Sequence, residues 1–353
     1  MPGPSVKRVG AQRSSRGRVV ISREDRIKTR RDLGDLRGLL ITEALKKRYE
    51  RALQRFFVFE DSGTSFYSRS TLDLDEGVAA FIECLWHEGE PRYWGEDVIS
   101  GLTKFVPGLK GCFNLSWSLI TAWQKNELPQ RCVPLDVRTF KAYCGVALHL
   151  GEPEFALLLA LGYHGLLRTA EMYNINIGDM EMDIGGSTGV LTLPHSKSGT
   201  RYNIVESVVI DDCSILARWR ELTAGRMPGD SIYVGGARGF RKLFDKITNM
   251  LKLPSGLLYK PYSIRRGAAT TFFRIFGSMS KTCVRGRWNN ERSCRIYINE
   301  AVQTMANIRF SGACTEELEH WSTSAETWFS REDYSRYSTR VVFKRGRSAL
   351  HDL

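Results

Sequence analysis

The sequence lacks the cysteine spacing that a metal site or a disulfide framework requires. Its eight cysteines include no Cys-x-x-Cys pair, and its six histidines form no cluster at zinc-ligand spacing. We therefore expect neither a disulfide framework nor a metal site. Cysteines scattered in this way are typical of a reducing compartment.

Long apolar runs are also missing. The longest, residues 155–167, is interrupted by Gly162, His164 and Gly165, and none reaches the roughly 18 residues that a membrane-spanning helix needs. We find no internal repeat, and the glycines around residues 235–239 lack the spacing and the lysine of a phosphate-binding loop. The sequence therefore argues against a membrane span and indicates no nucleotide cofactor.

Acidic residues are absent from the first 22 positions, which hold five Lys or Arg and several serines but no apolar signal segment. Three interpretations stay open: a disordered arm that contacts DNA, a nuclear import signal and an organellar transit segment. We expect residues 1–32 to form a basic, disordered arm. The expected location is an intracellular compartment that contains DNA, the nucleus if the cell is eukaryotic, with organellar targeting as an alternative.

Positive charge is what the sequence has in excess. The net charge is +12 and the pI is about 9.4, which favours a polyanionic partner because each neutralised phosphate releases counterions. Anionic membrane is the competing partner class. With 42% hydrophobic and 25% charged residues over 353 positions, the chain is typical of a globular protein, and its length favours two domains.

The first domain is predicted to be helical and to span residues 33–130. Apolar residues recur at helical spacing over residues 33–57, with Lys and Arg on the other faces, either solvated or in contact with phosphate. Ten acidic residues against two arginines between positions 60 and 97 predict a part that faces away from DNA. Further helices are predicted at 75–87, 96–105 and 116–126, and Pro129 and Pro134 mark the boundary.

The second domain, residues 135–310, mixes helices with a short β-hairpin. Helices are predicted at 135–150, 152–165, 215–224, 240–251, 262–276 and 290–304. Between residues 190 and 209 two β-type segments flank a Ser/Gly-containing turn that carries Lys197. The expected fold class is thus mainly α with a small antiparallel sheet, followed by an aromatic and basic tail over residues 311–353.

Seven residues of the second domain resemble the catalytic set of the tyrosine recombinase, or phage integrase, family. In that family an arginine is followed three residues on by an acid, then by a lysine on a β-hairpin and a His-x-x-Arg sequence. A His or Trp preceded by glycine and a tyrosine nine residues later complete the set. The resemblance covers residues 135–305 well and the first domain only in helical character. The corresponding positions are Arg168, Glu171, Lys197, Tyr262 in place of the histidine, Arg265, Trp288 (in Gly-Arg-Trp) and Tyr297.

The residue types suit metal-free cleavage of a phosphodiester. Arg168 and Arg265 can neutralise the pentacoordinate phosphorus, since guanidinium groups keep their charge and bond phosphate bidentately. Trp288 has one indole N–H that can donate to a phosphate oxygen. Lys197 can protonate the leaving 5′ oxygen and Tyr297 can attack phosphorus, giving a 3′-phosphotyrosyl link that reseals without ATP.

Each of these residues also has a plainer interpretation. An isolated arginine or a turn lysine is ordinarily a surface residue, and Trp288 can be a core side chain. Glu171 lies one helical turn from Arg168, so it can orient that side chain or form an ordinary intrahelical ion pair. The ordered set of matches is what favours the catalytic interpretation of all of them.

One position departs from the family pattern. Tyr262 stands where the family has histidine, and a phenol with a pKa near 10 is a donor and a poor base. His195, two residues before Lys197 and so on the same strand face, is a candidate substitute base; the alternative is a plain hairpin histidine. The hypothesis predicts that His195→Ala lowers cleavage far more than DNA binding.

The resemblance implies a site-specific DNA recombinase or integrase that acts on double-stranded DNA without a cofactor and assembles as a dimer or tetramer on paired sites. The alternative is a catalytically decayed, recombinase-derived DNA-binding protein, with Tyr262 as the first sign of decay. A type IB topoisomerase, which acts without paired sites, is the third choice. The aromatic tail either docks on a neighbouring protomer or caps its own domain.

Overall fold

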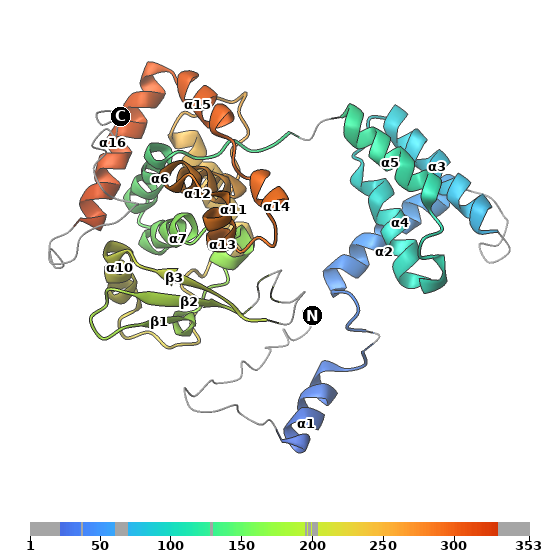
Figure 1. The fold of residues 1–353 in the computed structure, drawn as a ribbon, viewed down its shortest axis with the longest axis horizontal. Coiled ribbons are helices and arrows are strands. Elements are labelled where there is room, and N and C mark those ends of the chain that lie inside the picture. The colour runs from blue at the N-terminus through green and yellow to red at the C-terminus, as the bar shows by residue number, and fades with distance from the viewer. Residues whose placement is uncertain are drawn as a thin grey trace. The chain divides into compact units, whose positions relative to one another are not determined.

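The computed structural model describes residues 22–36, 38–60, 70–127, 130–194, 196, 199 and 204–330, and the chain divides into two compact units, Met1–Pro129 and Gln130–Leu353. Unit 1 is helical and unit 2 combines helices with one sheet (Figure 1). The predicted fold class, mainly α with a small antiparallel sheet, is confirmed. None of the described helices is both long and apolar enough to cross a membrane.

Unit 1 has its own apolar core. Val78, Ile82 and Leu85 of one helix and Val98 of another are fully buried in it. The core forms because each helix presents one apolar stripe and keeps its charged residues outside. The described elements are α1 (Arg23–Leu33), α2 (Glu43–Glu60), α3 (Thr71–His87), α4 (Tyr93–Phe105), the 3₁₀ turn η2 (Pro107–Leu109) and α5 (Asn114–Asn126).

The start of unit 1 differs from the prediction of one helix over residues 33–57. Helix α1 ends at Leu33 because Gly34 takes φ 79°, and α2 begins only at Glu43. Leu36 and Leu40, which the periodicity places on an apolar stripe, lie between the helices and are exposed. Helix α1 also occupies residues 23–32 of the expected disordered arm, although none of its residues is buried.

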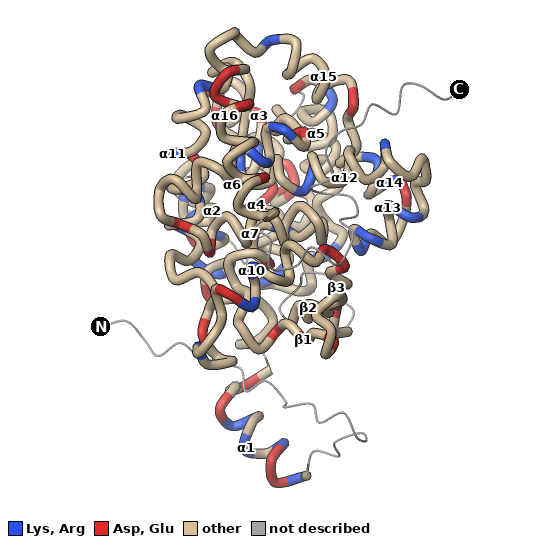
Figure 2. Tube along the Cα trace, turned by 90° about the vertical axis from the view of Figure 1, so that its left-hand side faces the viewer, with Lys and Arg blue, Asp and Glu red and all other residues tan. Residues whose placement is uncertain are grey.

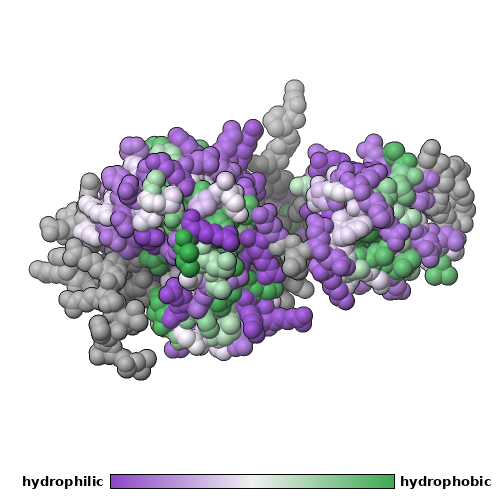
Figure 3. All heavy atoms as spheres, turned by 90° about the horizontal axis from the view of Figure 1, so that it is seen from above, coloured by the Kyte–Doolittle hydropathy of each residue, from purple (hydrophilic) through white to green (hydrophobic). Residues whose placement is uncertain are grey.

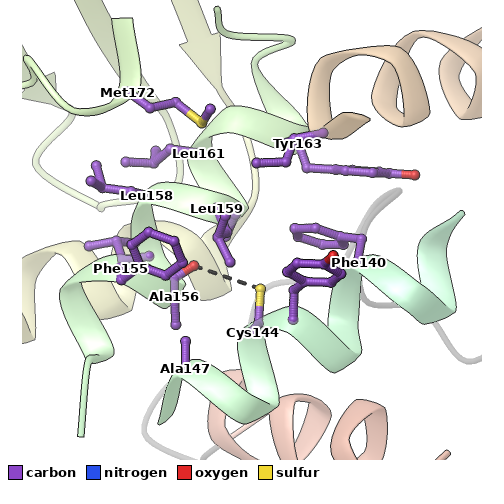
Figure 4. Close-up of a cluster of buried hydrophobic side chains, with 14 of the residues drawn as sticks. Phe140, Cys144, Ala147, Phe155, Ala156, Leu158, Leu159, Leu161, Tyr163 and Met172 are labelled. Carbon is purple, nitrogen blue, oxygen red and sulfur yellow. Dashed lines mark hydrogen bonds between the residues drawn. The ribbon is translucent and has the colours of Figure 1, made fainter. Parts of the chain in front are cut away.

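Unit 2 is built around helix α7, whose residues from Phe155 to His164 are all buried. It packs against α6, α8, α10 and α12. Figure 4 shows α7 side chains such as Leu159 meeting Phe140 and Cys144 of α6, and the Cys144 thiol donates to the Ala156 carbonyl at 3.8 Å. The elements before the sheet are α6 (Val137–His149), α7 (Pro153–His164), α8 (Thr169–Met172) and η3 (Ile177–Asp179).

The sheet has the antiparallel order β1-β2-β3, with strands Met180–Met182, Gly189–Leu193 and Glu206–Ile210. Leu191 pairs with Val208 and Leu193 with Glu206. The predicted hairpin is therefore present, β1 is an additional strand, and β3 begins later than the predicted β segment. Alternate residues of β3 are buried, so Glu206 lies on the same inward face as Val208 and Ile210.

The helices after the sheet carry the rest of the resemblance to the recombinases. Asn299 caps α15 by accepting from the Val302 N–H at 3.0 Å, so the helix predicted over residues 290–304 is broken into two. Helices α13 and α16 are not predicted from the sequence. The elements are α10 (Cys213–Thr223), α11 (Gly236–Met250), α12 (Tyr262–Phe276), α13 (Met279–Gly286), α14 (Glu291–Arg295), α15 (Glu300–Ile308) and α16 (Gly312–Phe329).

Helix α16 caps unit 2 from within the same chain. It lies along α6 (Figure 1), where Gly145 allows a close approach: a Cβ at that position would meet the Trp321 carbonyl oxygen at 2.0 Å. Lys141 pairs with Glu326 at 2.6 Å, and Arg218 stacks on Trp328 at 5.4 Å. The aromatic residues at 321 and 328 therefore pack on their own domain in this structure.

The surfaces of the two units carry the mixture of hydrophilic and apolar side chains that is ordinary for globular proteins. On the face in Figure 3, hydrophilic side chains dominate both units, and each unit also shows smaller apolar patches of its own. In unit 1 the exposed apolar side chains include Phe57, Val58 and Leu72. In unit 2 Lys and Arg are frequent on the segments labelled α12, α13 and α14 (Figure 2). These helices are the ones that carry or flank Arg265, Trp288 and Tyr297.

Candidate functional site

Arg168 caps the start of helix α8, and Glu171 lies in the first turn of that helix. The backbone reverses at Leu166, which takes φ 49°, a left-handed conformation that costs about 1–2 kcal/mol for a residue with a side chain. The Glu171 carboxylate accepts the Arg168 backbone N–H at 2.8 Å and its Nη1 at 2.6 Å. The acid therefore fixes both the main chain and the guanidinium of Arg168.

Among the predicted site residues that the structure describes, Arg265 is the most deeply buried, with 1% of its surface exposed. Its guanidinium donates to the backbone carbonyls of Leu166 and, at 2.6 Å, of Gly286. Its central carbon lies 4.6 Å from the ring centroid of Trp288 and 5.4 Å from that of Tyr297. Burial, with the neighbouring Arg287 and Arg168, lowers the Arg265 pKa to about 10, so it stays charged at neutral pH.

Three aromatic side chains meet beside Arg265. The centroid of Tyr297 lies 4.5 Å from Trp288 and 5.4 Å from Tyr262. Tyr297 is not inside a helix as the sequence suggests, but in the turn between α14 and α15, where its carbonyl accepts from the Thr270 hydroxyl at 3.5 Å. Helix α12, which begins at Tyr262 directly after Pro261, brings Tyr262, Arg265 and Thr270 to this turn.

The surroundings of Tyr297 favour its phenolate. Burial opposes ionisation, yet the donor Tyr262, the Arg265 charge and the Trp288 indole together hold the Tyr297 pKa below its ordinary value. Burial and the hydrogen bond to Tyr297 raise the pKa of Tyr262 above its usual range. Tyr262 therefore stays protonated as a donor while Tyr297 is the more acidic phenol.

Several buried donors of this site have no hydrogen-bond acceptor among the residues that the structure describes. They include the Trp288 Nε1 and the Arg265 Nε. The Trp288 indole N–H is close enough to the Tyr297 phenol to lower its pKa, but it does not form a hydrogen bond of regular geometry with it. Because buried donors are normally paired, a cluster of unpaired donors around a cation indicates a site for an anion.

Two charged residues of the site were not among the sequence-predicted set. The Arg287 Nη2 donates to Glu171 at 2.6 Å, and the Arg287 Nε lies 3.5 Å from a Glu206 carboxylate oxygen. Arg287 has φ 56°, the left-handed conformation that usually takes glycine. The sequence signals were present but weak: Arg287 directly precedes Trp288, and Glu206 occupies an alternating, inward position of a predicted strand.

The structure thus brings together Arg168, Glu171, Tyr262, Arg265, Trp288 and Tyr297. Lys197 and His195, the predicted hairpin residues, lie outside the described residues. Over the described part of the chain, no group of three or more His, Cys, Asp or Glu side chains is placed to hold a metal ion. All eight cysteines are free thiols.

No protein-family model and no curated protein matches the sequence. The fold nevertheless has solved counterparts, among them integrases bound to DNA.

Two integrase structures illustrate the match. A Tn1549 transposon integrase in complex with circular intermediate DNA has a TM-score of 0.52 and 11% identity, covering 77% of this chain and 95% of that chain. A lambda integrase dimer bound to a COC′ core site has a TM-score of 0.51 and 14% identity, covering 74% of this chain and 90% of that chain. At such identities the likeness establishes the fold, and the resemblance seen in the sequence motifs is confirmed at that level.

Proposed function

We propose that the protein is a site-specific DNA recombinase that cleaves and rejoins DNA through a 3′-phosphotyrosyl intermediate on Tyr297. The observation that carries the proposal is the contact of Tyr297 with the buried Arg265 and with the rings of Trp288 and Tyr262 in a partly buried cluster of donors. A phenol with a lowered pKa beside unpaired cationic donors has what attack on a phosphodiester needs. The matching integrase structures, which contain DNA, support double-stranded DNA as the partner.

The charge of each site residue determines its role in the reaction. Arg168 and Arg265 offset the negative charge that grows on the phosphate oxygens, and Trp288 adds a neutral donor. The Tyr297 oxygen forms a bond to phosphorus while the bond to the 5′ oxygen breaks, and Lys197 supplies the proton that the leaving oxygen takes up. A 5′ hydroxyl then attacks the phosphotyrosine and releases Tyr297, so no external energy source is required.

The proton that leaves Tyr297 needs an acceptor. Tyr262, Trp288 and Arg265, which favour the phenolate, are all donors, so none of them can take it. Glu171 is already bonded to two arginines. His195 is the candidate side chain, and if it takes the proton His195→Ala lowers cleavage but leaves DNA binding intact. A His195→Ala protein that cleaves at the wild-type rate would instead assign the proton to solvent or a phosphate oxygen.

Unit 1 and self-association complete the proposal. Residues 33–130 serve as a DNA-binding domain: Lys47 and Arg51 of α2 are exposed, whereas Arg48 and Arg55 are tied to Asp97 and Glu90. Assembly as a dimer or tetramer on paired sites distinguishes this function from that of a type IB topoisomerase. Sedimentation of the protein with a duplex that carries one or two sites tests the assembly.

The decisive experiment traps the covalent intermediate. A random-sequence library of nicked duplexes is incubated with the protein and resolved by denaturing electrophoresis. After cleavage these duplexes lose the short fragment that carries the new 5′ hydroxyl, so the strand cannot be resealed. We expect an adduct with wild type and none with Tyr297→Phe, while both proteins bind DNA equally. Sequencing the trapped DNA then identifies the target site.

A specific observation also supports the second function, a DNA-binding protein that has lost catalysis. Tyr262 replaces the family's histidine, and its raised pKa makes it unable to act as a base near neutral pH. This alternative predicts sequence-selective binding without an adduct on any library member. If Tyr262→His then produced an adduct that Tyr297→Phe abolished, the lost group would be identified.

A further inference from the structure

Four charged side chains behind the aromatic cluster form a closed ring of alternating sign. Arg168 lies 2.6 Å from Glu171, Glu171 lies 2.6 Å from Arg287, and Arg287 lies 3.5 Å from Glu206. The ring closes because the same Glu206 oxygen lies 3.6 Å from the Arg168 Nη1. Each arginine is thus placed between the same two carboxylates.

The ring joins three segments that are distant in sequence. Arg168 and Glu171 lie at the start of helix α8, Glu206 begins strand β3, and Arg287 directly follows helix α13. The side chains of Glu171, Glu206 and Arg287 are only 3%, 7% and 8% exposed. Arg287 holds its position despite a left-handed backbone, and the next residue is Trp288. The chain thus tolerates backbone strain where the Arg287 guanidinium enters the ring.

The charges of the ring cancel only when Arg287 is present. Two arginines face two carboxylates, so the adjacent Arg265, which contacts Trp288 and Tyr297, retains an unbalanced positive charge. Without Arg287, the two buried carboxylates would face Arg168 alone. The excess negative charge would then attract Arg168 and Arg265 and repel a phosphate at short range, where low dielectric strengthens both effects.

We propose that Arg287 is a positioning residue that acts through Glu171 and Glu206. It neutralises both carboxylates, fixes the Arg168 guanidinium between them, and leaves the positive charge of Arg265 for an anion. The Arg287 Nη2 donates to Glu171 and its Nε lies 3.5 Å from a Glu206 oxygen, so Arg287 is directed at the two carboxylates and acts through them. The expected effect of Arg287 on cleavage rests on the proposed function. The expected effect of Arg287 on anion binding rests on geometry alone.

Charge arithmetic supplies the test. Arg287→Met keeps the apolar stem but leaves the ring with one arginine and two carboxylates, a net charge of −1. Glu206→Gln leaves a net charge of +1, and the double variant restores zero. We expect Arg287→Met to lower single-turnover adduct formation at saturating DNA by about 100-fold, a loss of the size seen when one electrostatic contribution is removed. The double variant should recover to within about 10-fold of wild type.

A purely structural role for Arg287 predicts a different pattern, because removing a second ring member then worsens the defect. A double variant as slow as Arg287→Met, or slower, overturns the proposal, and so does an Arg287→Met protein with wild-type cleavage. Thermal unfolding of each variant identifies any that fail to fold. Arg218→Met is the matched control, since Arg218 is equally buried in unit 2 but contacts Trp328 and Glu221 instead; folded Arg218→Met protein should form adduct at the wild-type rate.

A second readout needs no catalysis. Thermal stabilisation by inorganic phosphate is titrated for the same variants, with Arg265→Lys defining the background from other sites. We expect Arg287→Met to weaken the Arg265-dependent phosphate affinity about 10-fold and the double variant to restore it. If this series fails, the proposal is overturned even where wild type forms adduct. If the series holds but no protein forms adduct, the proposed function fails while the role of Arg287 at an anion site stands.

Discussion

Both units bury a carboxylate near the start of a helix, but they give it different partners. In unit 1, Asp75 accepts the backbone N–H groups of Leu115 at 2.9 Å and Ser116 at 3.0 Å, together with the Ser116 hydroxyl. In unit 2, Glu171 accepts from Arg168 and Arg287. Neutral donors are sufficient to satisfy a buried carboxylate, as Asp75 shows. The two arginines bound by Glu171 are therefore not needed merely to satisfy a buried carboxylate, which points to a role in chemistry.

The arginines repeat the contrast. Arg55 of unit 1 lies over Trp94 at 5.3 Å and pairs with Glu90 at 2.7 Å, with a third of its side chain exposed. Arg265 lies over Trp288 at 4.6 Å, is almost fully buried and donates to backbone carbonyls. The same pair of residue types thus serves a solvated surface in one unit and an anion site in the other. Three substitutions, each with a control variant, test how far this difference holds.

The largest expected effect is on Arg265. In Arg265→Lys the ammonium cannot reproduce the planar guanidinium contacts with Leu166, Gly286 and the phosphate. We expect adduct formation to fall about 100- to 1,000-fold, the usual loss when one donor to a developing oxyanion is removed. Single-turnover trapping with the nicked substrate measures it.

Arg55→Lys is the matched control in unit 1. Exposed ion pairs contribute little, so its cleavage rate and its unfolding should stay close to those of wild type. Equal losses in the two variants would mean that stacking on tryptophan, and not burial beside Tyr297, determines the importance of the arginine.

The next effect concerns stability. Asp75→Ala removes the acceptor for Leu115 and Ser116 at the start of α5, and leaving such buried donors unpaired costs about 1–3 kcal/mol. We expect a lower denaturation midpoint for unit 1 and unchanged phosphate binding by unit 2. Glu76→Ala, on the exposed side of the same helix, is the control and should leave the midpoint unchanged. If Asp75→Ala also weakened phosphate binding by unit 2, the role of Asp75 would not be confined to the stability of unit 1.

Much of the site was predictable because it rests on residue type and spacing. The spacing of Arg168 to Glu171 and of Trp288 to Tyr297 is fixed in the chain, and helix α12 begins and ends where its pattern predicts, at Tyr262 and Phe276. Proline before the helix and glycine after it explain that accuracy. The two-stranded pairing also followed from β-type alternation between residues 190 and 209.

What could not be predicted depends on tertiary contacts. Arg287 enters the site only because α13 ends in a left-handed turn that directs its side chain to Glu171 and Glu206. Glu171 lies 116 residues away in the sequence, and Glu206 lies on strand β3. In the sequence Asn299 is an ordinary residue of the predicted helix over residues 290–304. Only the structure shows that its side chain caps α15. The pairing of β1, a three-residue strand, with β2 has no periodic signal of its own.

The smallest expected effect distinguishes the two phenols. Cleavage by Tyr297 requires its phenolate, so the rate should rise with pH until the lowered pKa of Tyr297 is passed and then level off. Tyr262→Phe removes the donor that favours this phenolate, which raises the Tyr297 pKa and moves the rise to higher pH. A shift of about one pH unit lowers the rate near neutral pH about 10-fold, with both proteins converging at high pH.

The shape of the curve decides the role of Tyr262, because a group that receives the proton behaves differently from one that donates a hydrogen bond. Loss of a proton acceptor would lower the rate at every pH without moving the rise. Phe57→Leu, at an exposed ring of unit 1, is a control that should leave the profile unchanged. A displaced rise in Tyr262→Phe would therefore assign Tyr262 to tuning the nucleophile, and the departure from histidine would be a change in how Tyr297 is activated rather than a loss of activity.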